Sequence, residues 1–292
     1  MFTKRQLTNI EIFEDTEEQC LTHLALKTAI KQADQQQYIV YENDVVMTNK
    51  EPKFRKPAKV MVSKKRSLEA AKAYPGMKVA VHNFASATNP GGGVIRGSNA
   101  QEEAICRCST LFFNLYKEEM RIGFYDHHRN MLKSGEMDVT YNDDCIYTPG
   151  IVVFKTDTVS PQIMPEKDWY RVDVISCAAP NLRYNPSNPM NPNSGNKAVQ
   201  LSDMELFTLH VKRMRRILDI AKRENVEVII LGAFGCGAFY NSPEVVAEVM
   251  TQVIKEYSYD FKVIEFAVYC SPDHTENYDV FERKLRDVSG RS

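Results

Sequence analysis

The pattern of apolar and polar residues alternates between two periods along most of the chain. Short apolar runs bounded by turn residues predict strands, and apolar residues at helical spacing predict helices. Strands separated by helical segments are typical of an α/β fold with a mixed or parallel sheet and helices on both faces. The predicted strands are 59–63, 77–84, 151–154, 172–178, 226–231 and 263–270, and the predicted helices are 67–73, 101–120, 203–223 and 243–257.

The part of the chain before these segments is predicted to be mainly helical, with one short strand at 38–41. We therefore divide the chain into an N-terminal helical segment, residues 1–57, and a larger α/β domain, residues 58–292, on which it packs. Thr16 followed by Gln19 resembles a capping box at the start of a helix. The residues that then recur at helical spacing are Leu21, Leu24, Ala25 and Thr28.

Two predicted strands run directly into glycine-rich loops that are followed by helices. The first loop covers residues 83–93 and ends in three glycines, and the second covers residues 232–239. Ligands of α/β folds bind at the carboxyl ends of the strands, where such a loop presents backbone N–H groups to phosphate. The chain has neither the Walker loop nor the dinucleotide fingerprint. A tight turn is an equal alternative for the first loop taken alone.

Gln101, Glu102 and Glu103 stand in the first turn of the helix that follows the first loop. One interpretation is helix stabilisation, with Asn99 as the cap, Glu102 at the third position and both acids favouring the helix dipole. The other is a carboxylate held next to a bound sugar phosphate, where it acts as general acid and base on a glycosidic bond. Adjacent helical side chains point about 100° apart, so the two glutamates would have separate roles.

The second loop leads into a helix with Ser242 as N-cap and Pro243 at the first helical position. Phe239 is a candidate to cover a sugar face, and simple loop packing is the alternative for both Phe234 and Phe239. Cys236 has no neighbouring base in the sequence, so we interpret it as a small buried residue rather than a nucleophile.

A basic stretch with two prolines, KEPKFRKPAK at residues 50–59, precedes the α/β domain. Charge runs usually lie in water, which favours a solvated connector. The alternative is a patch that attracts a phosphate-bearing ligand. A second stretch, residues 185–197, is rich in Asn, Pro and Ser and is either a lid over the site or a surface insert.

Composition narrows the class of protein. The 292 residues carry 37 Lys and Arg against 38 Asp and Glu, so the net charge of −1 gives no overall signature of nucleic-acid binding. Seven cysteines without a CxxC pair argue against a disulfide framework and against a zinc site. The N-terminal residues lack the apolar run of a signal peptide, and the apolar runs are too short to span a bilayer. We therefore expect a cytoplasmic protein with no membrane partner.

The spacing of the first loop and the acidic pair carries a family resemblance. Asn89-Pro90-Gly91-Gly92-Gly93, followed after seven residues by Gln101-Glu102-Glu103, resembles the GGG…QEE signature of the microbial-type poly(ADP-ribose) glycohydrolases. The segments VAVHNFASATNPGGG, IYTPGIVVFKTD, VISCAAPNL and LGAFGCGAFYNSP also look similar to this family. The resemblance implies a macrodomain, a three-layer α/β/α sandwich with a mixed sheet, here with an N-terminal helical extension.

The resemblance also implies an activity and a set of residues. The enzyme would be a glycosidase that cleaves the ribose glycosidic bond of poly(ADP-ribose) and releases ADP-ribose, with no metal and no cofactor. Glu103 would be the catalytic acid and base, and Glu102 would bind ribose hydroxyls. The implied ligand-binding residues are Asn89, Gly91, Gly92, Gly93 and Gln101 in the first unit and Gly235, Cys236, Gly237, Ala238 and Phe239 in the second.

Other substrates and two other functions stay open at this point, and one of these functions is nucleotide binding with unrelated chemistry. The bond cleaved could join a single ADP-ribose to a protein or to a nucleic acid, so that nucleic acid enters only as a modified substrate. The protein could also bind ADP-ribose without cleaving it. Two local features depart from the expected pattern or stand outside it. Tyr240 stands where many members of the family have glycine or another small residue, and the pair His127-His128 is expected to have a structural or surface role.

Overall fold

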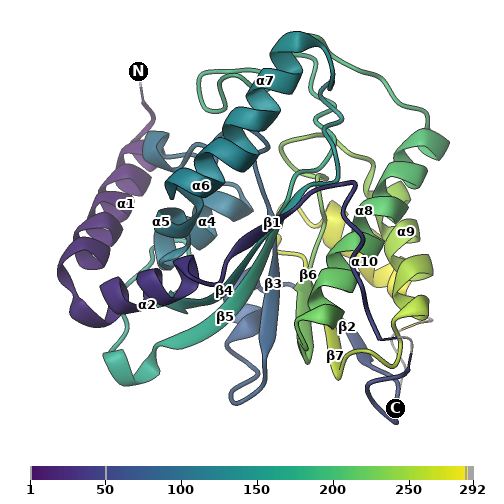
Figure 1. Cartoon of the computed structure of the whole chain (residues 1–292), viewed down its shortest axis with the longest axis horizontal. Coiled ribbons are helices and arrows are strands. Elements are labelled where there is room, and N and C mark those ends of the chain that lie inside the picture. The colour runs from purple at the N-terminus through teal and green to yellow at the C-terminus, as the bar shows by residue number, and fades with distance from the viewer. Residues whose placement is uncertain (1, 50, 287, 289–292) are drawn as a thin grey trace.

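The computed structural model describes residues 2–49, 51–286 and 288, and within them a mixed seven-stranded sheet has the order β1-β4-β5-β3-β6-β7-β2 (Figure 1). Lys50, part of the basic stretch, lies outside the described residues. The strands are β1 (Tyr38–Val40), β2 (Lys59–Ser63), β3 (Val79–Phe84), β4 (Cys145–Val153), β5 (Tyr170–Cys177), β6 (Val228–Leu231) and β7 (Val263–Ala267). Strands β5, β3, β6, β7 and β2 pair in parallel, while β4 is antiparallel to both β5 and β1.

Helices cover both faces of the sheet. They are α1 (Lys4–Thr22), α2 (Leu24–Asp34), α3 (Ser67–Ala71), α4 (Gln101–Cys108), α5 (Leu111–Leu115), α6 (Glu118–Met120), α7 (His127–Ser134), α8 (Asp203–Arg223), α9 (Pro243–Glu256) and α10 (Glu276–Leu285). Figure 1 shows α8, α9 and α10 on one side of the sheet and α1, α2, α4, α5 and α6 on the other. The α/β fold with a mixed sheet and a helical N-terminal part is therefore confirmed.

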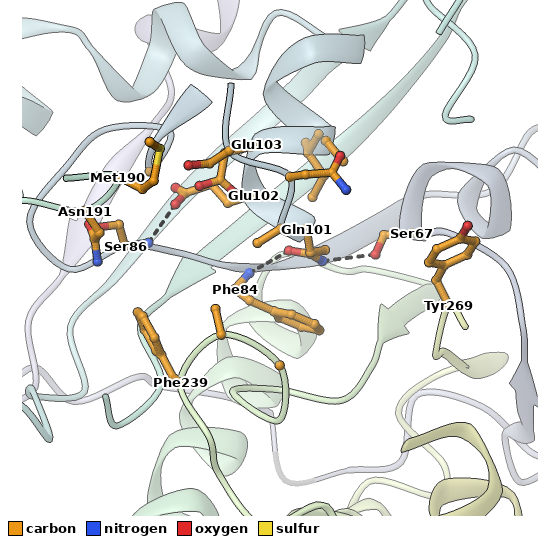
Figure 2. Close-up of a pocket in the computed structure, with 18 of the residues that line it drawn as sticks. Ser67, Phe84, Ser86, Gln101, Glu102, Glu103, Met190, Asn191, Phe239 and Tyr269 are labelled. Atoms are coloured by element: carbon orange, nitrogen blue, oxygen red, sulfur yellow. Dashed lines mark hydrogen bonds between the residues drawn. The ribbon is translucent and has the colours of Figure 1, made fainter. Parts of the chain in front are cut away.

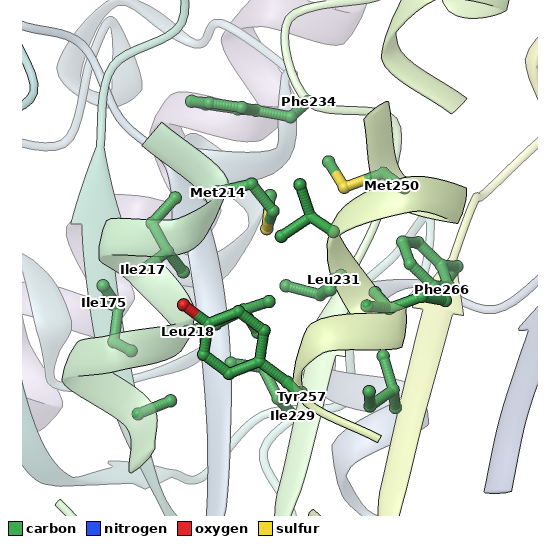
Figure 3. Close-up of a cluster of buried hydrophobic side chains, with 14 of the residues drawn as sticks. Ile175, Met214, Ile217, Leu218, Ile229, Leu231, Phe234, Met250, Tyr257 and Phe266 are labelled. Atoms are coloured by element: carbon green, nitrogen blue, oxygen red, sulfur yellow. The ribbon is translucent and has the colours of Figure 1, made fainter. Parts of the chain in front are cut away.

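Successive side chains along the strands point alternately to the two faces of the sheet, and each face is covered by its own hydrophobic core. On β6, Ile229 and Leu231 pack against the side chains of α8 and α9 (Figure 3), whereas Val228 and Ile230 belong to the core on the other face. Since successive strand side chains point to opposite faces, a continuous apolar strand such as this one has to be covered on both sides. The central strands are thus held rigidly, and the loops at their carboxyl ends are well anchored.

Each predicted strand is present, and the long helix α8 has the predicted bounds. The largest error in a strand is at β4, which begins at Cys145 rather than at residue 151. Pro149 and Gly150 look like a turn in the sequence. In the structure Gly150 takes φ +62° and the pairing with β5 shifts register between Thr148 and Ile151, so the strand continues through a bulge. The pattern also does not predict α7 or α10.

The helix predicted at 101–120 is wrong as a single element, because three shorter helices occupy this range. After α4 the backbone of Ser109 is extended, with φ −147° and ψ 178°. The next residue bonds to the end of β4 twice: Thr110 N–H donates to the Val152 carbonyl at 3.0 Å, and Val152 N–H donates to the Thr110 hydroxyl at 3.1 Å. Pairing with a distant strand therefore interrupts a segment whose own periodicity is helical.

The predicted N-terminal capping box is also in the wrong place. The cap of α1 is Thr3, whose hydroxyl accepts from Gln6 N–H while the Gln6 side chain accepts from Thr3 N–H. Thr16 lies inside α1 and its hydroxyl donates to the Arg107 carbonyl at 2.6 Å. The predicted buried face is wrong at three of its four positions, since Leu21 and Leu24 are 62% and 77% exposed and Thr28 is exposed as well. The buried apolar residues of α1 and α2 are Phe13, Cys20, Leu26, Ala29 and Ala33.

The described part of the basic stretch is a connector at the amino-terminal edge of the sheet. Phe54 N–H donates to the Tyr259 carbonyl, and the Lys53 ammonium donates to the carbonyl of Val226, just before β6. The glycine loops follow the carboxyl ends of the strands, at the opposite edge. A phosphate-attracting role for residues 51–59 next to those loops is therefore excluded by position.

The N-terminal segment contributes to the central sheet as well as to its helical cover. Strand β1, which precedes the proposed boundary at residue 57, pairs with β4, and α1 packs on the segment before α4, where Asn9 donates to the Gly97 carbonyl at 2.9 Å. The division into residues 1–57 and 58–292 stays a proposal. Among the described residues, no helix is both long enough and apolar enough to cross a membrane.

Candidate active site

Both glycine loops lie at one edge of the sheet, as predicted, because β3 and β6 are neighbouring parallel strands. The two loops border a cavity of about 780 Å³ (Figure 2), a size suited to a dinucleotide-sized ligand. Gly92, Gln101, Glu102 and Glu103 line it from the first unit. Gly235, Gly237, Ala238 and Phe239 line it from the second. Asn89, Gly91, Gly93 and Cys236 belong to the same loops but do not border the cavity.

Glu102 is buried and both of its carboxylate oxygens have partners in the protein. Its Oε2 accepts from the backbone N–H of Ser86 at 2.7 Å, and its Oε1 accepts from the Asn83 carboxamide at 3.3 Å. Burial raises the pKa of the Glu102 carboxyl well above its ordinary value, and the neighbouring Glu103 raises it further. The carboxylate is thus held in one orientation from the end of β3.

Glu103 is buried too, but only one of its oxygens is engaged. Oε1 accepts from the backbone N–H of Gly93 at 2.9 Å, whereas Oε2 is buried and has no hydrogen-bond partner. Burial raises the pKa of the Glu103 carboxyl, which the hydrogen bond from Gly93 partly opposes. A carboxyl group with a raised pKa and a free oxygen is suited to carry a proton to a ligand.

Gly92 lies between the two carboxylates. A Cβ at this position would come within 2.5 Å of Glu103 Oε1 and 3.1 Å of Glu102 Oε2, and its φ is +61°. Both the backbone conformation and the lack of space therefore require glycine. The two glutamates leave the helix in different directions, as expected, but they approach the same glycine from two sides.

Ala100, and not Asn99, is the N-cap of α4, so the predicted cap is wrong. The Asn99 side chain instead accepts from the Arg107 guanidinium at 3.0 Å. With this start, Glu103 rather than Glu102 takes the third helical position. Gln101 ties the helix to β3, since it accepts from Phe84 N–H at 2.8 Å (Figure 2) and also donates to the His82 carbonyl at 2.8 Å.

Residues 188–194 close the cavity beside the first loop. Asn89 donates to the Asn191 side chain at 2.7 Å and to the Pro192 carbonyl at 2.8 Å, and the Ser86 hydroxyl donates to Asn191 at 3.0 Å. Met190 and Asn191 line the cavity and lie on the same side as the two glutamates in Figure 2. The stretch that the sequence leaves open between lid and insert therefore forms a wall of the site.

The buried carboxamide of Asn241 holds the second loop in place. Asn241 donates to the carbonyls of Pro180, at 2.7 Å, and Phe239, at 3.1 Å, and its oxygen lies 2.7 Å from His210 Nε2. Since the Asn241 nitrogen faces two carbonyls, its oxygen is the acceptor and His210 Nε2 carries the proton. The Cys236 thiol donates to the Phe234 carbonyl, and burial raises its pKa, which fits the predicted non-nucleophilic role.

Sequence analysis missed how the first loop is supported from behind. The His128 ring lies between the Ala87 carbonyl, 3.0 Å from Nδ1, and the Asp144 carboxylate, 2.9 Å from Nε2, and Arg129 donates to the Thr88 carbonyl. His128 thus has the structural role that was predicted, and that role is to anchor a loop of the site. No local signal points to it, because the contacts span 41 residues of sequence.

The sequence offers Arg66, with Lys64 and Lys65, only as a group that could help to dock an anionic partner, and it does not place the other end of the cavity. Ser67, Arg66 and Tyr269 line it, and the Arg66 guanidinium lies 4.0 Å from the centre of the Tyr269 ring. Asp157 borders this region and accepts from Leu68 N–H. Tyr269 follows β7, which ends at Ala267, three residues before the predicted end, so the loop that carries it was assigned to the strand.

Among residues 2–49, 51–286 and 288, no group of three His, Cys, Asp or Glu side chains comes together as a metal site would require. Comparison with known proteins then places the chain in a family. A family model described as the catalytic domain of microbial-type PARG matches residues 9–156. A search of curated protein sequences gave no significant match.

Solved structures agree with the family match. The poly(ADP-ribose) glycohydrolase (PARG) of Thermomonospora curvata is 26% identical, with 95% of this chain and 99% of that chain covered and a TM-score of 0.80. The same enzyme bound to the inhibitor ADP-HPD gives 25% identity, the same coverage and a TM-score of 0.78. PARG of Deinococcus radiodurans in complex with ADP-ribose gives 26% identity over 89% and 98% of the two chains, with a TM-score of 0.74. The chain belongs to the microbial-type PARG catalytic domain family, and it is a glycosidase.

Proposed function

We propose that this protein hydrolyses poly(ADP-ribose) at the glycosidic bond between two riboses and releases ADP-ribose. The similar enzymes from T. curvata and D. radiodurans are named poly(ADP-ribose) glycohydrolases, and their structures hold an inhibitor or ADP-ribose. The present cavity has the volume for such a ligand and two backbone loops suited to its diphosphate.

The observation that carries the mechanism is the unequal engagement of the two glutamates. Glu103 keeps one buried oxygen without a partner, whereas both oxygens of Glu102 accept hydrogen bonds from the protein. Glu103 in its protonated form would donate its proton to the bridging oxygen as the bond from C1″ to that oxygen breaks. The bonding electrons leave with the oxygen, and C1″ becomes oxocarbenium-like.

The second half of the reaction returns the proton. The Glu103 carboxylate removes a proton from water, the water oxygen bonds to C1″, and the enzyme regains its starting state. Glu102 would accept hydrogen bonds from ribose hydroxyls, since a carboxylate has lone pairs beyond the two that Ser86 and Asn83 occupy. This sequence of steps needs only side chains and water.

The glycine loops would bind the rest of the ADP-ribose unit. Gly91, Gly92 and Gly93, with Gly235, Cys236, Gly237 and Ala238, would direct backbone N–H groups to the diphosphate from two sides. Phe239, which lines the cavity opposite Glu102 in Figure 2, would pack on the distal ribose. Asn89 and Gln101 are already bonded within the protein, so they would act by shaping the site.

The proposal is tested by release of free ADP-ribose from poly(ADP-ribose), followed by chromatography. Glu103→Ala and Glu103→Gln should each lower kcat by about 10²–10⁴-fold, as expected for loss of a general acid and base. Calorimetry with ADP-ribose should show binding by Glu103→Gln, because glutamine keeps a side-chain oxygen that can accept from the Gly93 N–H of the first loop. Full activity of either variant would disprove the role of Glu103.

A native protein that binds ADP-ribose but releases none from poly(ADP-ribose) would point elsewhere. The same assay on singly ADP-ribosylated protein and nucleic acid then separates a different hydrolase from a protein that only binds ADP-ribose. Failure to bind ADP-ribose at all would overturn the assignment of the cavity.

A further inference from the structure

An arginine and a tyrosine stand together at the rim of the cavity, beyond Phe239, and the mechanism above does not use them. The Arg183 guanidinium lies 5.9 Å from the centre of the Tyr240 ring. Arg183 lines the cavity, and Tyr240 follows Phe239 directly in the second loop. The pair therefore adjoins the part of the site that we assign to the distal ribose.

Arg183 is a cation without a carboxylate partner among the described residues. None of the ion pairs found there includes it, and no acceptor is recorded for its guanidinium. A half-buried guanidinium that borders a cavity and has no carboxylate partner is suited to bind an anion, and phosphate is the group that its planar fork fits best.

Tyr240 occupies a position that its own backbone disfavours. Its φ is +58°, in the left-handed region, and its side chain is 67% exposed. Glycine would adopt this conformation at no cost, and burial does not explain why a large aromatic residue is placed there. Strained residues with exposed side chains are typical of binding sites, where the ligand supplies the contact that the free protein lacks.

The backbone under the pair is fixed. Leu182 N–H donates to the Phe239 carbonyl at 3.0 Å, and Asn241 donates to the Pro180 carbonyl at 2.7 Å. These bonds join the segment that carries Arg183 to the loop that carries Tyr240. The rim is therefore a prepared surface, and binding to it costs little ordering of the chain.

The chemistry of the polymer indicates what such a surface would meet. In poly(ADP-ribose) the bridging oxygen belongs to the adenosine of the next unit, so the leaving group begins with a nucleoside and continues as a diphosphate. An aromatic ring and a guanidinium side by side match these two parts, since bases stack on aromatic side chains and Arg binds phosphate.

We infer that Arg183 and Tyr240 form a subsite for the leaving ADP-ribose unit. The Tyr240 ring stacks on its adenine, and the Arg183 guanidinium binds its diphosphate. With this subsite, the enzyme prefers poly(ADP-ribose) as substrate over a single ADP-ribose linked to a small acceptor. This inference rests on the proposed function, because it concerns the leaving group of the same reaction.

The test compares two substrates that share the bound unit and differ in the leaving group. One is the dimer of ADP-ribose, and the other is ADP-ribose linked at C1″ to 4-nitrophenol, which lacks the nucleotide. Tyr240→Gly and Arg183→Met should each lower the ratio of kcat/KM for the dimer to kcat/KM for the nitrophenyl substrate by about ten-fold, the lower part of the range for one stacked base. Tyr240→Gly also relieves the strained φ, so a loss with this variant is not explained by misfolding.

Conservative variants provide the matched control. Tyr240→Phe keeps the ring and should keep the ratio of the native protein, while Arg183→Lys should retain part of it. A ratio unchanged by Tyr240→Gly and Arg183→Met overturns the subsite, and so does an equal loss on both substrates, which would place the pair at the bound unit. If the native protein cleaves neither substrate, the proposed function fails instead.

Discussion

At the scale of single residues, the main property of the site is the contrast between two adjacent glutamates. Glu102 and Glu103 are both buried, yet only Glu103 retains an oxygen without a partner. An unpaired polar atom in a protein interior is costly, and here it belongs to a residue that lines the cavity. The same burial that raises the pKa of Glu103 therefore costs stability, and the proposed mechanism uses the raised pKa for proton transfer.

This cost predicts how stability depends on pH. A carboxyl whose pKa is raised by folding holds its proton more tightly in the folded chain. As pH rises from its ordinary value of 4.5 through the raised pKa, the unfolded chain loses the proton first, so the free energy of unfolding falls. Glu103→Gln removes this titration. The variant should therefore melt higher than the native protein at pH 8, by about 2–4 °C for each kcal/mol gained.

Thermal unfolding of both proteins between pH 4.5 and pH 8 measures this effect. The difference in Tm should be small at pH 4.5 and should grow as the pH rises. A difference in Tm that is constant with pH would show that burial does not raise the pKa of the Glu103 carboxyl. A variant that melts lower than the native protein at pH 8 would show the same. Glu103→Gln should also have lost hydrolase activity, so one side chain would affect stability and activity in opposite directions.

At the scale of elements, a helix remote in sequence holds the first glycine loop. Helix α7 follows a π-helical turn, Arg121–Asp126, and places His128 between Asp144 and the Ala87 carbonyl. Although burial acts in the other direction, the hydrogen bond from His128 lowers the pKa of Asp144 overall. Both ring nitrogens face acceptors, so the ring joins the loop to the strand end before β4.

His128→Gln should therefore weaken both stability and activity. Glutamine can replace one of the two hydrogen bonds but leaves Asp144 with a weaker partner, so we expect a loss of about 3 kcal/mol, the size found when a buried pair is broken. Urea unfolding measures this loss. His127→Gln is the matched control, because His127 is exposed and should change stability by less than about 0.5 kcal/mol. Equal effects of the two variants would contradict a special role for His128.

At the scale of the whole molecule, the N-terminal helix is part of the wall behind the site. Lys155 is buried two residues after the end of β4 and has its partners on α1, where its ammonium donates to Thr16 at 2.7 Å and pairs with Asp15 at 2.6 Å. At the other end of α1, the backbone of Gln6 lies very close to Gly97. A Cβ on residue 97 would lie 2.2 Å from the carbonyl oxygen of Gln6.

Comparing alanine substitutions at two glycines with nearly equal φ distinguishes the cost of losing space next to α1 from the cost of backbone strain. Gly97 has φ +75° and meets α1, whereas Gly76 has φ +77° and nothing within 4 Å of its Cβ position. Gly76→Ala should cost about 1 kcal/mol from strain alone. Gly97→Ala should cost about 1–3 kcal/mol more, the usual penalty for overpacking. Chemical unfolding followed by circular dichroism measures both values.

The form of the unfolding curve carries further information. If α1 and the α/β domain fold as one unit, Gly97→Ala shifts a single transition. Two separate transitions would favour the proposed boundary at residue 57 as a true division. Equal costs for the two alanine variants would show that the contact with Gly97 contributes little.

Local chemistry was enough to predict the elements and the loops of the site. Ser242 and Pro243 start α9 as predicted, and the apolar run of β6 is covered on both faces, because capping and periodicity depend on residues within a few positions of one another. Placing both glycine loops at one edge needed only the rule that ligands of α/β sheets lie at the carboxyl ends of strands. Prediction failed where a distant partner decided the outcome, as at Ser109, where pairing with Val153 breaks a helix.

The sequence by itself thus determined the α/β architecture, the two glycine-rich loops and the acidic pair in the first turn of α4. The tertiary structure alone decided which glutamate keeps a free oxygen, because the groups that engage Glu102 come from β3 and the loop after it. It also decided that residues 188–194 and α7 support the first loop, since these contacts join residues 41 to 105 positions apart. Backbone propensities act over one turn of helix or strand, whereas the environment of a buried carboxylate is set by whichever side chains the completed fold brings around it.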